Sequence, residues 1–371
     1  MYNEFYGFSR DPFVIVPDPN YLYMSPKHEE ALARLVLGIK ERRAVILLTG
    51  EVGVGKTTLI RFLTSRLPAQ IRPATISNSN LDAEALLRMI LAEFGLPAPA
   101  EADKSALIKG LQNHLESLAA QRHRGLLIID EAQNLPLDAL EEVRMLGNLQ
   151  HGNYSLLQIL LVGQPELRAR MRDPRYTQIA QRIALSYHID ALNLEETRAY
   201  IVYRLKRSGG SPEIFTGDAV EKVYQLSRGI PRLINLVCDS ALIYGFSEEQ
   251  RLIHEAVVVK AARQLDLMGL LSAKDGAGPE AERPLAPQRG DGGSAAQADG
   301  LEKTLARFLD EFREEVRKIA EQVGKANSAA LNLTLAMEKL LEQERTRCIK
   351  LPPDRATLDF LRRILTGEMK Q

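Results

Sequence analysis

The residues best suited to phosphate chemistry form one run, Gly50-Glu51-Val52-Gly53-Val54-Gly55-Lys56-Thr57-Thr58. The run has the spacing G-x-x-x-x-G-K-[ST], in which glycines let backbone N–H groups turn toward a bound phosphate. We expect Lys56 to bind the β- and γ-phosphates of ATP, and the Thr57 hydroxyl to hold Mg²⁺. This run is therefore predicted to be a nucleotide-binding loop.

A second pair of chemical residues, Asp130 and Glu131, follows the apolar run Leu126-Leu127-Ile128-Ile129. Such a run is typical of a buried central strand, whose carboxyl end would enter the nucleotide site. We expect Asp130 to coordinate Mg²⁺, directly or through water, and Glu131 to activate the attacking water. An acidic pair after a strand is common by itself, so the prediction depends on its combination with the phosphate loop.

Three further polar residues occupy positions from which they could reach a nucleotide. Gln164 follows the apolar run 157–162, and we expect it to contact the γ-phosphate or the attacking water; the alternative is a glutamine that only fixes its loop. Arg182 precedes the last strand, and we expect it to reach the site of a neighbouring subunit as an arginine finger. Arg172 and Arg175 compete for this role, and a solvated surface arginine is the alternative.

Arg232 lies in Gly229-Ile230-Pro231-Arg232, a sequence suited to the start of a helix. From there we expect Arg232 to point back across the nucleotide from a second domain. The alternative is an ordinary charged residue in the first turn of a helix.

The elements that must position these residues follow an alternating order. Apolar runs predict strands at 44–49, 72–77, 125–130, 157–162 and 184–189, and helical spacing marks the segments 82–95, 104–121 and 137–150. This alternation predicts an α/β fold with a parallel sheet and helices on both faces. From 194 the strands stop, and helices are expected at 195–206, 218–226, 231–244 and 255–265.

The last hundred residues differ in composition from the rest. Residues 271–300 are rich in Gly, Ala, Pro, Asp and Glu, which predicts a disordered linker. Beyond it, apolar residues from Leu301 to Leu340 recur every three or four positions and predict a long amphipathic helix. We expect residues 301–371 to bind a partner helix, with folding back on the chain's own core as the alternative. The predicted domains are thus 1–193, 194–270, 271–300 and 301–371.

Composition limits the function further. The chain of 371 residues contains 48 basic and 48 acidic residues, so it gives no global case for binding nucleic acid or an anionic membrane. Its two cysteines show no metal-ligand spacing. Because neither a signal peptide nor a membrane span is recognisable, we expect a cytoplasmic protein, unless a partner recruits it to the inner membrane.

The motifs together resemble those of AAA+ ATPases over residues 25 to 265. The N-terminal string Phe5-Tyr6-Gly7-Phe8, the segments Pro12-Phe13 and His28-Glu29-Glu30-Ala31-Leu32, and the runs 130–135 and 163–167 resemble the secretion-associated, ExeA-like group. The resemblance implies an AAA+ core with a helical lid, and an oligomer (ring or filament) that hydrolyses ATP with Mg²⁺. It also implies service in secretion, export or surface-polysaccharide assembly, with a protein partner from that system.

The part of the chain after the ATPase region departs from the well-known members of this group. Well-known secretion members of the group carry a membrane span and a peptidoglycan-binding module after the ATPase, where this chain has a linker and an amphipathic helix. Peptidoglycan binding is therefore not expected, and the chain resembles shorter members from exopolysaccharide or protein-sorting loci.

An alternative function is a DNA-associated ATP switch of the transposition-regulator type, which the neutral composition disfavours. A scaffold that binds nucleotide without turnover is disfavoured because Lys56 and Glu131 are both present.

Overall fold

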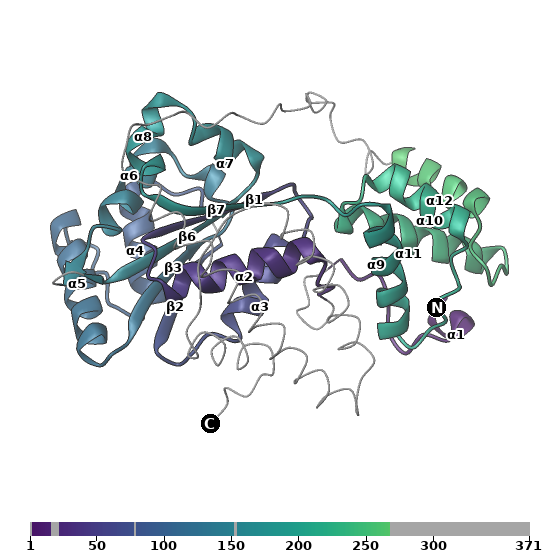
Figure 1. The fold of residues 1–371 in the computed structure, drawn as a ribbon, viewed down its shortest axis with the longest axis horizontal. Helices are drawn as coiled ribbons and strands as arrows, with labels where there is room; N and C mark the ends of the chain where they lie inside the picture. Colours follow the sequence, from purple (N-terminus) through teal and green to yellow (C-terminus); the bar gives the residue numbers. More distant parts are fainter. Residues whose placement is uncertain (1, 16–21, 78, 152–153, 268–371) are drawn as a thin grey trace, which may run out of the picture. The chain divides into compact units, whose positions relative to one another are not determined.

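The computed structural model describes residues 2–15, 22–77, 79–151 and 154–267 (Figure 1). The expected linker at 271–300 and amphipathic helix at 301–371 lie outside the described residues. Within the described residues, the chain forms an α/β domain followed by a group of helices.

The α/β domain is built on five parallel strands in the order β2-β3-β6-β1-β7. The strands are β1 (Val45–Gly50), β2 (Ile71–Ile76), β3 (Arg124–Ile129), β6 (Leu157–Gly163) and β7 (Ile183–Ile189). Each lies within one residue of the predicted strand, so the prediction of a parallel sheet is confirmed. Because the strands are parallel, the loops after β1, β3 and β6 leave from the same edge of the sheet, and these loops carry the predicted site residues.

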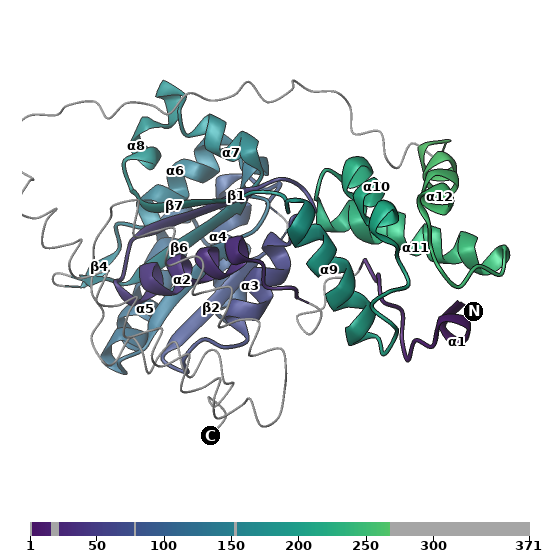
Figure 2. The same ribbon diagram turned by 45° about the vertical axis from the view of Figure 1, so that its right-hand side comes forward.

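Helices cover both faces of this sheet, as predicted. On one face lie α2 (Pro26–Lys40) and α3 (Lys56–Thr64), side by side in two views (Figures 1 and 2). The other face is covered by α4 (Ala83–Glu93), α5 (Lys104–Ala120) and α6 (Leu137–Leu146). The short helices α7 (Pro165–Arg170) and α8 (Thr177–Ala180) lie between β6 and β7 in the sequence.

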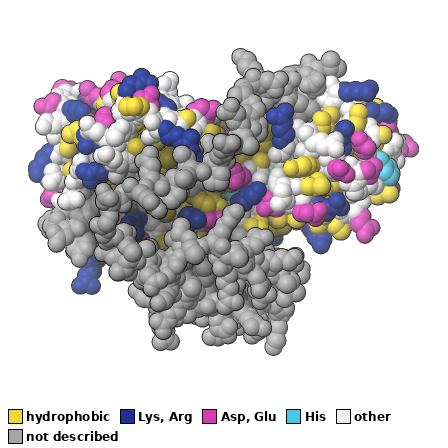
Figure 3. All heavy atoms as spheres, turned by 45° about the horizontal axis from the view of Figure 1, so that its top comes forward, with side chains coloured by type: hydrophobic (Ala, Val, Ile, Leu, Met, Phe, Trp, Pro, Cys, Tyr) yellow, Lys and Arg dark blue, Asp and Glu magenta, His cyan; other side chains and the backbone are white. Residues whose placement is uncertain are grey.

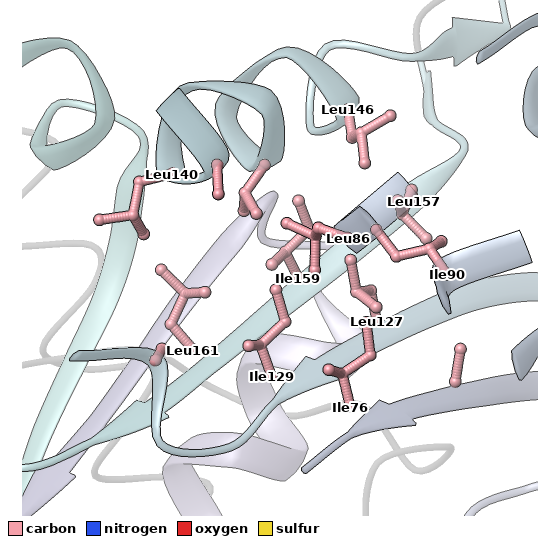
Figure 4. Close-up of a cluster of buried hydrophobic side chains, with 14 of the residues drawn as sticks. Ile76, Leu86, Ile90, Leu127, Ile129, Leu140, Leu146, Leu157, Ile159 and Leu161 are labelled. Carbon is pink, nitrogen blue, oxygen red and sulfur yellow. The ribbon is translucent and has the colours of Figure 1, made fainter. Parts of the chain in front are cut away.

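The core of the domain explains why these segments become strands. β1, β6 and all of β3 except its first residue are buried, because helices exclude water from both sides. Figure 4 shows Leu127 and Ile129 of β3 on the same face of the sheet as Leu86 of α4 and Leu140 of α6. In contrast, β7 is an edge strand and alternates between exposed and partly buried residues.

The second group of helices comprises α9 (Leu194–Arg207), α10 (Gly217–Ser227), α11 (Pro231–Ser247) and α12 (Glu255–Leu267). They share one apolar cluster, which also contains Tyr6, Phe8 and Phe13 from the N-terminal segment. The segment begins with α1 (Tyr2–Tyr6), and the Tyr6 hydroxyl donates to the Gln250 carbonyl oxygen at 2.9 Å. We expected the N-terminal segment to belong with the sheet domain, but its aromatic side chains pack with the helical domain.

The predicted helix at 137–150 is shorter than expected. It ends at Leu146 with Gly147 as C-cap, and the chain then forms the two short strands β4 (Gln150–His151) and β5 (Tyr154–Ser155), which pair antiparallel. Two 3₁₀ turns, η2 (Ala132–Asn134) and η3 (Pro174–Tyr176), follow β3 and α7 respectively. Within the described residues, no helix combines the length and the apolar composition needed to cross a bilayer.

Candidate nucleotide site

The predicted phosphate loop connects β1 to α3 and borders a cavity of about 490 Å³. Gly55 is the N-cap of α3 and has a φ of 100°, a conformation that residues with a Cβ rarely adopt. The loop residues Val52 to Thr58 all line the cavity, whereas Gly50 ends β1 and Glu51 is exposed. Backbone N–H groups at the start of α3 therefore border a space of the size expected for a small-molecule ligand.

Lys56 is buried within this loop, with 5% of its surface exposed. Its Nζ donates to the carbonyl oxygens of Gly50 at 2.7 Å and Glu51 at 2.9 Å. Burial lowers the pKa of Lys56, and nearby carboxylates, Glu131 foremost, act in the opposite direction. The ammonium group is thus held against the loop backbone, where a phosphate can take over its hydrogen bonds.

Thr57 and Asp130, the two residues expected to hold Mg²⁺, lie together. The Thr57 hydroxyl donates to Asp130 Oδ2 at 2.7 Å, and the backbone N–H of Glu131 donates to Oδ1 at 2.9 Å. Within the described residues, no group of three or more His, Cys, Asp or Glu side chains could hold a metal. Mg²⁺ at nucleotide sites commonly takes only one or two protein oxygens and completes its shell with phosphate and water. The hydroxyl–carboxylate pair therefore fits this ion.

Glu131 lies just beyond β3 in a left-handed conformation, with a φ of 53°. This conformation costs a non-glycine residue about 1–2 kcal/mol. The Ser79 hydroxyl donates to the Glu131 carbonyl oxygen at 2.6 Å and the Asn134 N–H donates to it at 2.9 Å, which holds the turn. The strained turn places the Glu131 side chain at the cavity wall.

The Glu131 carboxylate accepts hydrogen bonds from two amide groups. Gln164 Nε2 donates to Glu131 Oε2 at 3.0 Å, and Gln133 Nε2 donates to the same oxygen at 2.5 Å. Burial acts to raise the pKa of this carboxyl, but the two amide donors and the Lys56 charge outweigh it and leave the pKa below its ordinary value. Glu131 is therefore an anion at neutral pH, as a group that accepts a proton from water must be.

Gln164 follows β6, which separates β1 from β3 in the sheet. The strand order accordingly places Gln164 between the phosphate loop and Asp130. Its side chain contacts Glu131, so the structure brings together Gln164, Glu131 and the loop.

Arg182 lies outside this constellation. It is exposed and immediately precedes β7, whose Ile183 is paired with Val45 at the start of β1. Gly50 at the other end of β1 lies five residues further along the strand, on the order of 17 Å at the usual rise per residue. In the described part of the chain, the Arg182 guanidinium makes no side-chain hydrogen bond or ion pair. This geometry excludes Arg182 from the site of its own chain.

The two competing arginines differ from Arg182. Arg175 is paired with Asp173 at 2.7 Å, and Arg172 also has an interaction within the chain. Of these three arginines, Arg182 is thus the one whose side chain makes no hydrogen bond or ion pair within the described residues.

Arg232 lies in the first turn of α11 and lines the cavity from the helical domain. Its backbone N–H donates to the Gly53 carbonyl oxygen at 3.3 Å. A Cβ at Gly53 would come within 2.7 Å of Arg232 Cβ, so the absence of a side chain at Gly53 permits this close approach.

The sequence prediction missed a buried histidine beneath the loop. His28 on α2 lies 2.9 Å from the Val54 carbonyl oxygen through Nε2 and 2.6 Å from the Ser25 hydroxyl through Nδ1. Burial lowers the pKa of His28, so the ring is neutral. Because a carbonyl oxygen only accepts, Nε2 carries the proton and Nδ1 accepts from Ser25. The motif containing His28 contributes to the family resemblance, but its spacing gives no sign of this contact.

A second missed group forms the apolar part of the cavity. Val14 and Ile15 of the N-terminal segment line it, together with Tyr200 and Asn235 of the helical domain. Arg204 fixes the N-terminal segment there by donating to the carbonyl oxygens of Pro12 at 2.6 Å and Val14 at 3.0 Å. These contacts join residues about 190 positions apart in sequence, which no local pattern could have indicated.

The fold and the site define a class of protein. A family model described as "AAA domain" matches residues 39–171. Among solved structures, the Aeropyrum pernix ORC2 protein, in ADPNP–ADP complexes, has a TM-score of 0.53 at 17% identity, covering 97% of this chain and 90% of that chain. That likeness concerns the fold. With the phosphate loop and the Asp130–Glu131 pair, these findings define a P-loop ATPase of the AAA+ class.

Proteins related in sequence indicate the group of AAA+ ATPases to which the chain belongs. General secretion pathway protein A of Aeromonas hydrophila is 42% identical over 262 residues, which is 70% of this chain and 48% of that protein. The Mu-like prophage FluMu DNA transposition protein B of Haemophilus influenzae is 31% identical over 157 residues, 40% of this chain and 50% of that protein. The chain spans about half the length of the curated relatives it matches. It belongs to the ExeA-like AAA+ ATPases, and the resemblance found in the sequence is confirmed.

Proposed function

We propose that this chain hydrolyses ATP in an oligomer and that hydrolysis drives or regulates assembly of a secretion, export or surface-polysaccharide system. The single observation that carries the hydrolytic part is that Lys56, Thr57 and Glu131 line one cavity and that Thr57 is hydrogen-bonded to Asp130. Each group there has the charge and donor type that phosphoryl transfer requires.

In this proposal each residue of the site has its own role in the reaction. Lys56 exchanges its backbone hydrogen bonds for the β- and γ-phosphate oxygens, while N–H groups of the loop bind the remaining phosphate oxygens. Glu131 accepts a proton from the attacking water, and Gln164 orients that water or the γ-phosphate. The apolar wall that includes Val14 and Tyr200 receives the nucleobase.

Thr57 and Asp130 would hold Mg²⁺, directly or through water. When bound, this ion neutralises charge on the phosphates and so favours attack by water. The hydroxyl and the carboxylate already lie 2.7 Å apart, so both oxygens are available on one side of the loop.

Arg182 would complete the site of a neighbouring subunit. Its position at the opposite end of the sheet from the phosphate loop, together with its exposure, supports a contact with another subunit. An arginine supplied by a neighbour stabilises the charge that develops on the transferred phosphoryl group. The proposal therefore requires assembly into a ring or filament for turnover.

Arg232 would report the nucleotide state to the helical domain. Its backbone N–H donates to the Gly53 carbonyl oxygen, and the residue lines the cavity. Gain or loss of the γ-phosphate would change this contact and the position of α11. We propose that a protein partner binds through residues 301–371 and responds to the movement of α11.

The secretion part of the proposal is supported by the 42% identity to General secretion pathway protein A. The relative named for DNA transposition is less similar and covers less of the chain, so a DNA-associated ATP switch is the second candidate. On the face shown in Figure 3, basic and acidic side chains of the described residues are interspersed. A mixed surface of this kind on the visible face does not favour duplex DNA, which attracts clustered Lys and Arg.

Two measurements separate these functions. Replacing Glu131 by Gln in the chromosome should block release or surface display of the exported material, measured against wild-type cells. The purified protein with ATP should show little salt-dependent anisotropy change with a labelled DNA duplex. Tight ATP-dependent DNA binding, together with unchanged export in the Glu131→Gln strain, would favour the transposition-type switch.

A further inference from the structure

We propose that Gln133 is a positioning residue for ATP hydrolysis, which holds the Glu131 carboxylate turned toward Gln164. This inference rests on the proposed role of Glu131 as the group that activates water. It adds a residue that was not among the predicted site residues.

The contacts of Gln133 place it between Glu131 and Gln164. Its Nε2 donates to Glu131 Oε2 at 2.5 Å, and its Oε1 accepts from the backbone N–H of Gln164 at 3.1 Å. Both ends of one side-chain amide are therefore used, and the arrangement fixes which end is the donor. An apolar residue at this position could satisfy neither Glu131 nor the N–H of Gln164 at the start of α7.

The surroundings of Gln133 make this arrangement rigid. A Cβ at Gly163 would lie 2.9 Å from Gln133 Oε1, so the glycine before Gln164 makes room for the amide. The Arg170 guanidinium donates to the backbone carbonyl oxygens of Gln133 at 2.5 Å and Leu135 at 3.0 Å. Arg170 is itself held by the Tyr176 hydroxyl at 2.8 Å. The turn that carries Gln133 is thus tied to α7 and to η3.

These contacts give Gln133 a task distinct from that of Gln164. Both amides donate to the same oxygen of Glu131, which leaves Oε1 of that carboxylate to accept from water. When Gln164 turns toward a γ-phosphate or the attacking water, Gln133 remains as the donor to Oε2. Gln133 then keeps the carboxylate in place during turnover.

The test compares Gln133→Met, which keeps the side-chain length without the amide, with the wild type. We expect kcat for ATP to fall about tenfold, a fraction of what a general base contributes, while KM changes less than about twofold.

Asn134→Ala is the matched control, because Asn134 follows in the same 3₁₀ turn and its side chain is exposed. It should keep the wild-type kcat and KM. Binding of a fluorescent ATP analogue, measured for every variant, shows that each one folds. In a Glu131→Gln background, Gln133→Met should lower the residual rate no further, because Gln133 acts through Glu131.

The outcomes distinguish this inference from the proposed function. If Glu131→Gln abolishes turnover but Gln133→Met leaves kcat unchanged, the role of Gln133 is wrong and that of Glu131 stands. The role of Gln133 would also be wrong if Gln133→Met lowered kcat in the Glu131→Gln background by the same factor as in the wild type. If Glu131→Gln itself hydrolyses ATP at the wild-type rate, the proposed function fails first.

Discussion

Thr57 and Asp130 are joined by a 2.7 Å hydrogen bond, although 73 residues separate them in sequence. The strands that precede them, β1 and β3, are not neighbours, because β6 lies between them. The contact therefore spans the edge of the sheet and closes the site on the side where Gln164 emerges from β6. Parallel strand order alone brings the three groups together.

Lys56→Ala should weaken binding of ATP about 10- to 100-fold, because a charge-assisted hydrogen bond to phosphate contributes about 1.5–3 kcal/mol. Equilibrium titration with a fluorescent ATP analogue measures this. Lys109→Ala, an exposed lysine on α5, serves as the control and should bind normally. Unchanged affinity in Lys56→Ala would show that nucleotide binds elsewhere.

Arg182→Ala should bind ATP normally and hydrolyse it poorly, because the missing charge belongs to a neighbouring site. Mixing it with Glu131→Gln, each inactive alone, should restore part of the activity, since some interfaces then pair an intact Glu131 with an intact Arg182. Arg172→Ala and Arg175→Ala should retain most activity. Zero activity at every mixing ratio, with co-assembly confirmed by light scattering, would refute action between subunits.

The sequence predicted those parts of the fold that depend on local patterns. The buried strand β3 is apolar apart from its first residue, Arg124, and the phosphate loop has a fixed spacing, so both can be recognised without a structure. The edge strand β7 was also located, although its burial alternates. Arg232 was placed at the cavity because a proline at a helix start fixes the direction of α11.

The remaining parts depend on contacts that no local pattern reveals. Gln133 reaches Glu131 only because that residue is left-handed and the turn after it is tight. His28 becomes part of the site only when α2 packs beneath the phosphate loop. The apolar cavity wall needs the N-terminal segment to cross to the helical domain, where Arg204 binds its backbone. Such long-range packing determines a site as much as its motifs do.

Glu29 offers a test of the packing around α2. Burial raises the pKa of its carboxyl from 4.5 to about 7, and Oε2 has no hydrogen-bond partner among the described residues. In the unfolded chain the carboxyl ionises at lower pH, so its contribution to stability is present below about pH 4.5 and is lost as the pH rises through about 7. Glu29→Gln should therefore stabilise the protein at pH 8, by at most about 3 kcal/mol, and have little effect at pH 5.

Thermal melting at the two pH values checks this prediction. Glu221→Gln, an exposed residue on α10, is the control and should change the melting temperature equally little at both. A stabilisation by Glu29→Gln that is the same at pH 5 and pH 8 would contradict a raised pKa as its cause.

Deleting residues 301–371 should leave a folded core that binds ATP, because every predicted site residue precedes residue 235. The truncated protein should lose partner recruitment or part of its self-association, as light scattering would show. Its melting temperature should stay within a few degrees of that of the full chain. A large fall in melting temperature would mean that the tail packs on its own core, and the recruitment hypothesis would then be wrong.

The most direct test of the account is the fate of ATP in Glu131→Gln. This substitution keeps Lys56, Thr57 and Asp130 and removes only the group that accepts a proton from water, so nucleotide should bind with wild-type affinity. Quench and chromatographic analysis of the bound nucleotide should find ATP that persists, with turnover reduced about 100-fold or more. Release of ADP and phosphate at the wild-type rate, or loss of ATP binding, would contradict the role assigned to Glu131.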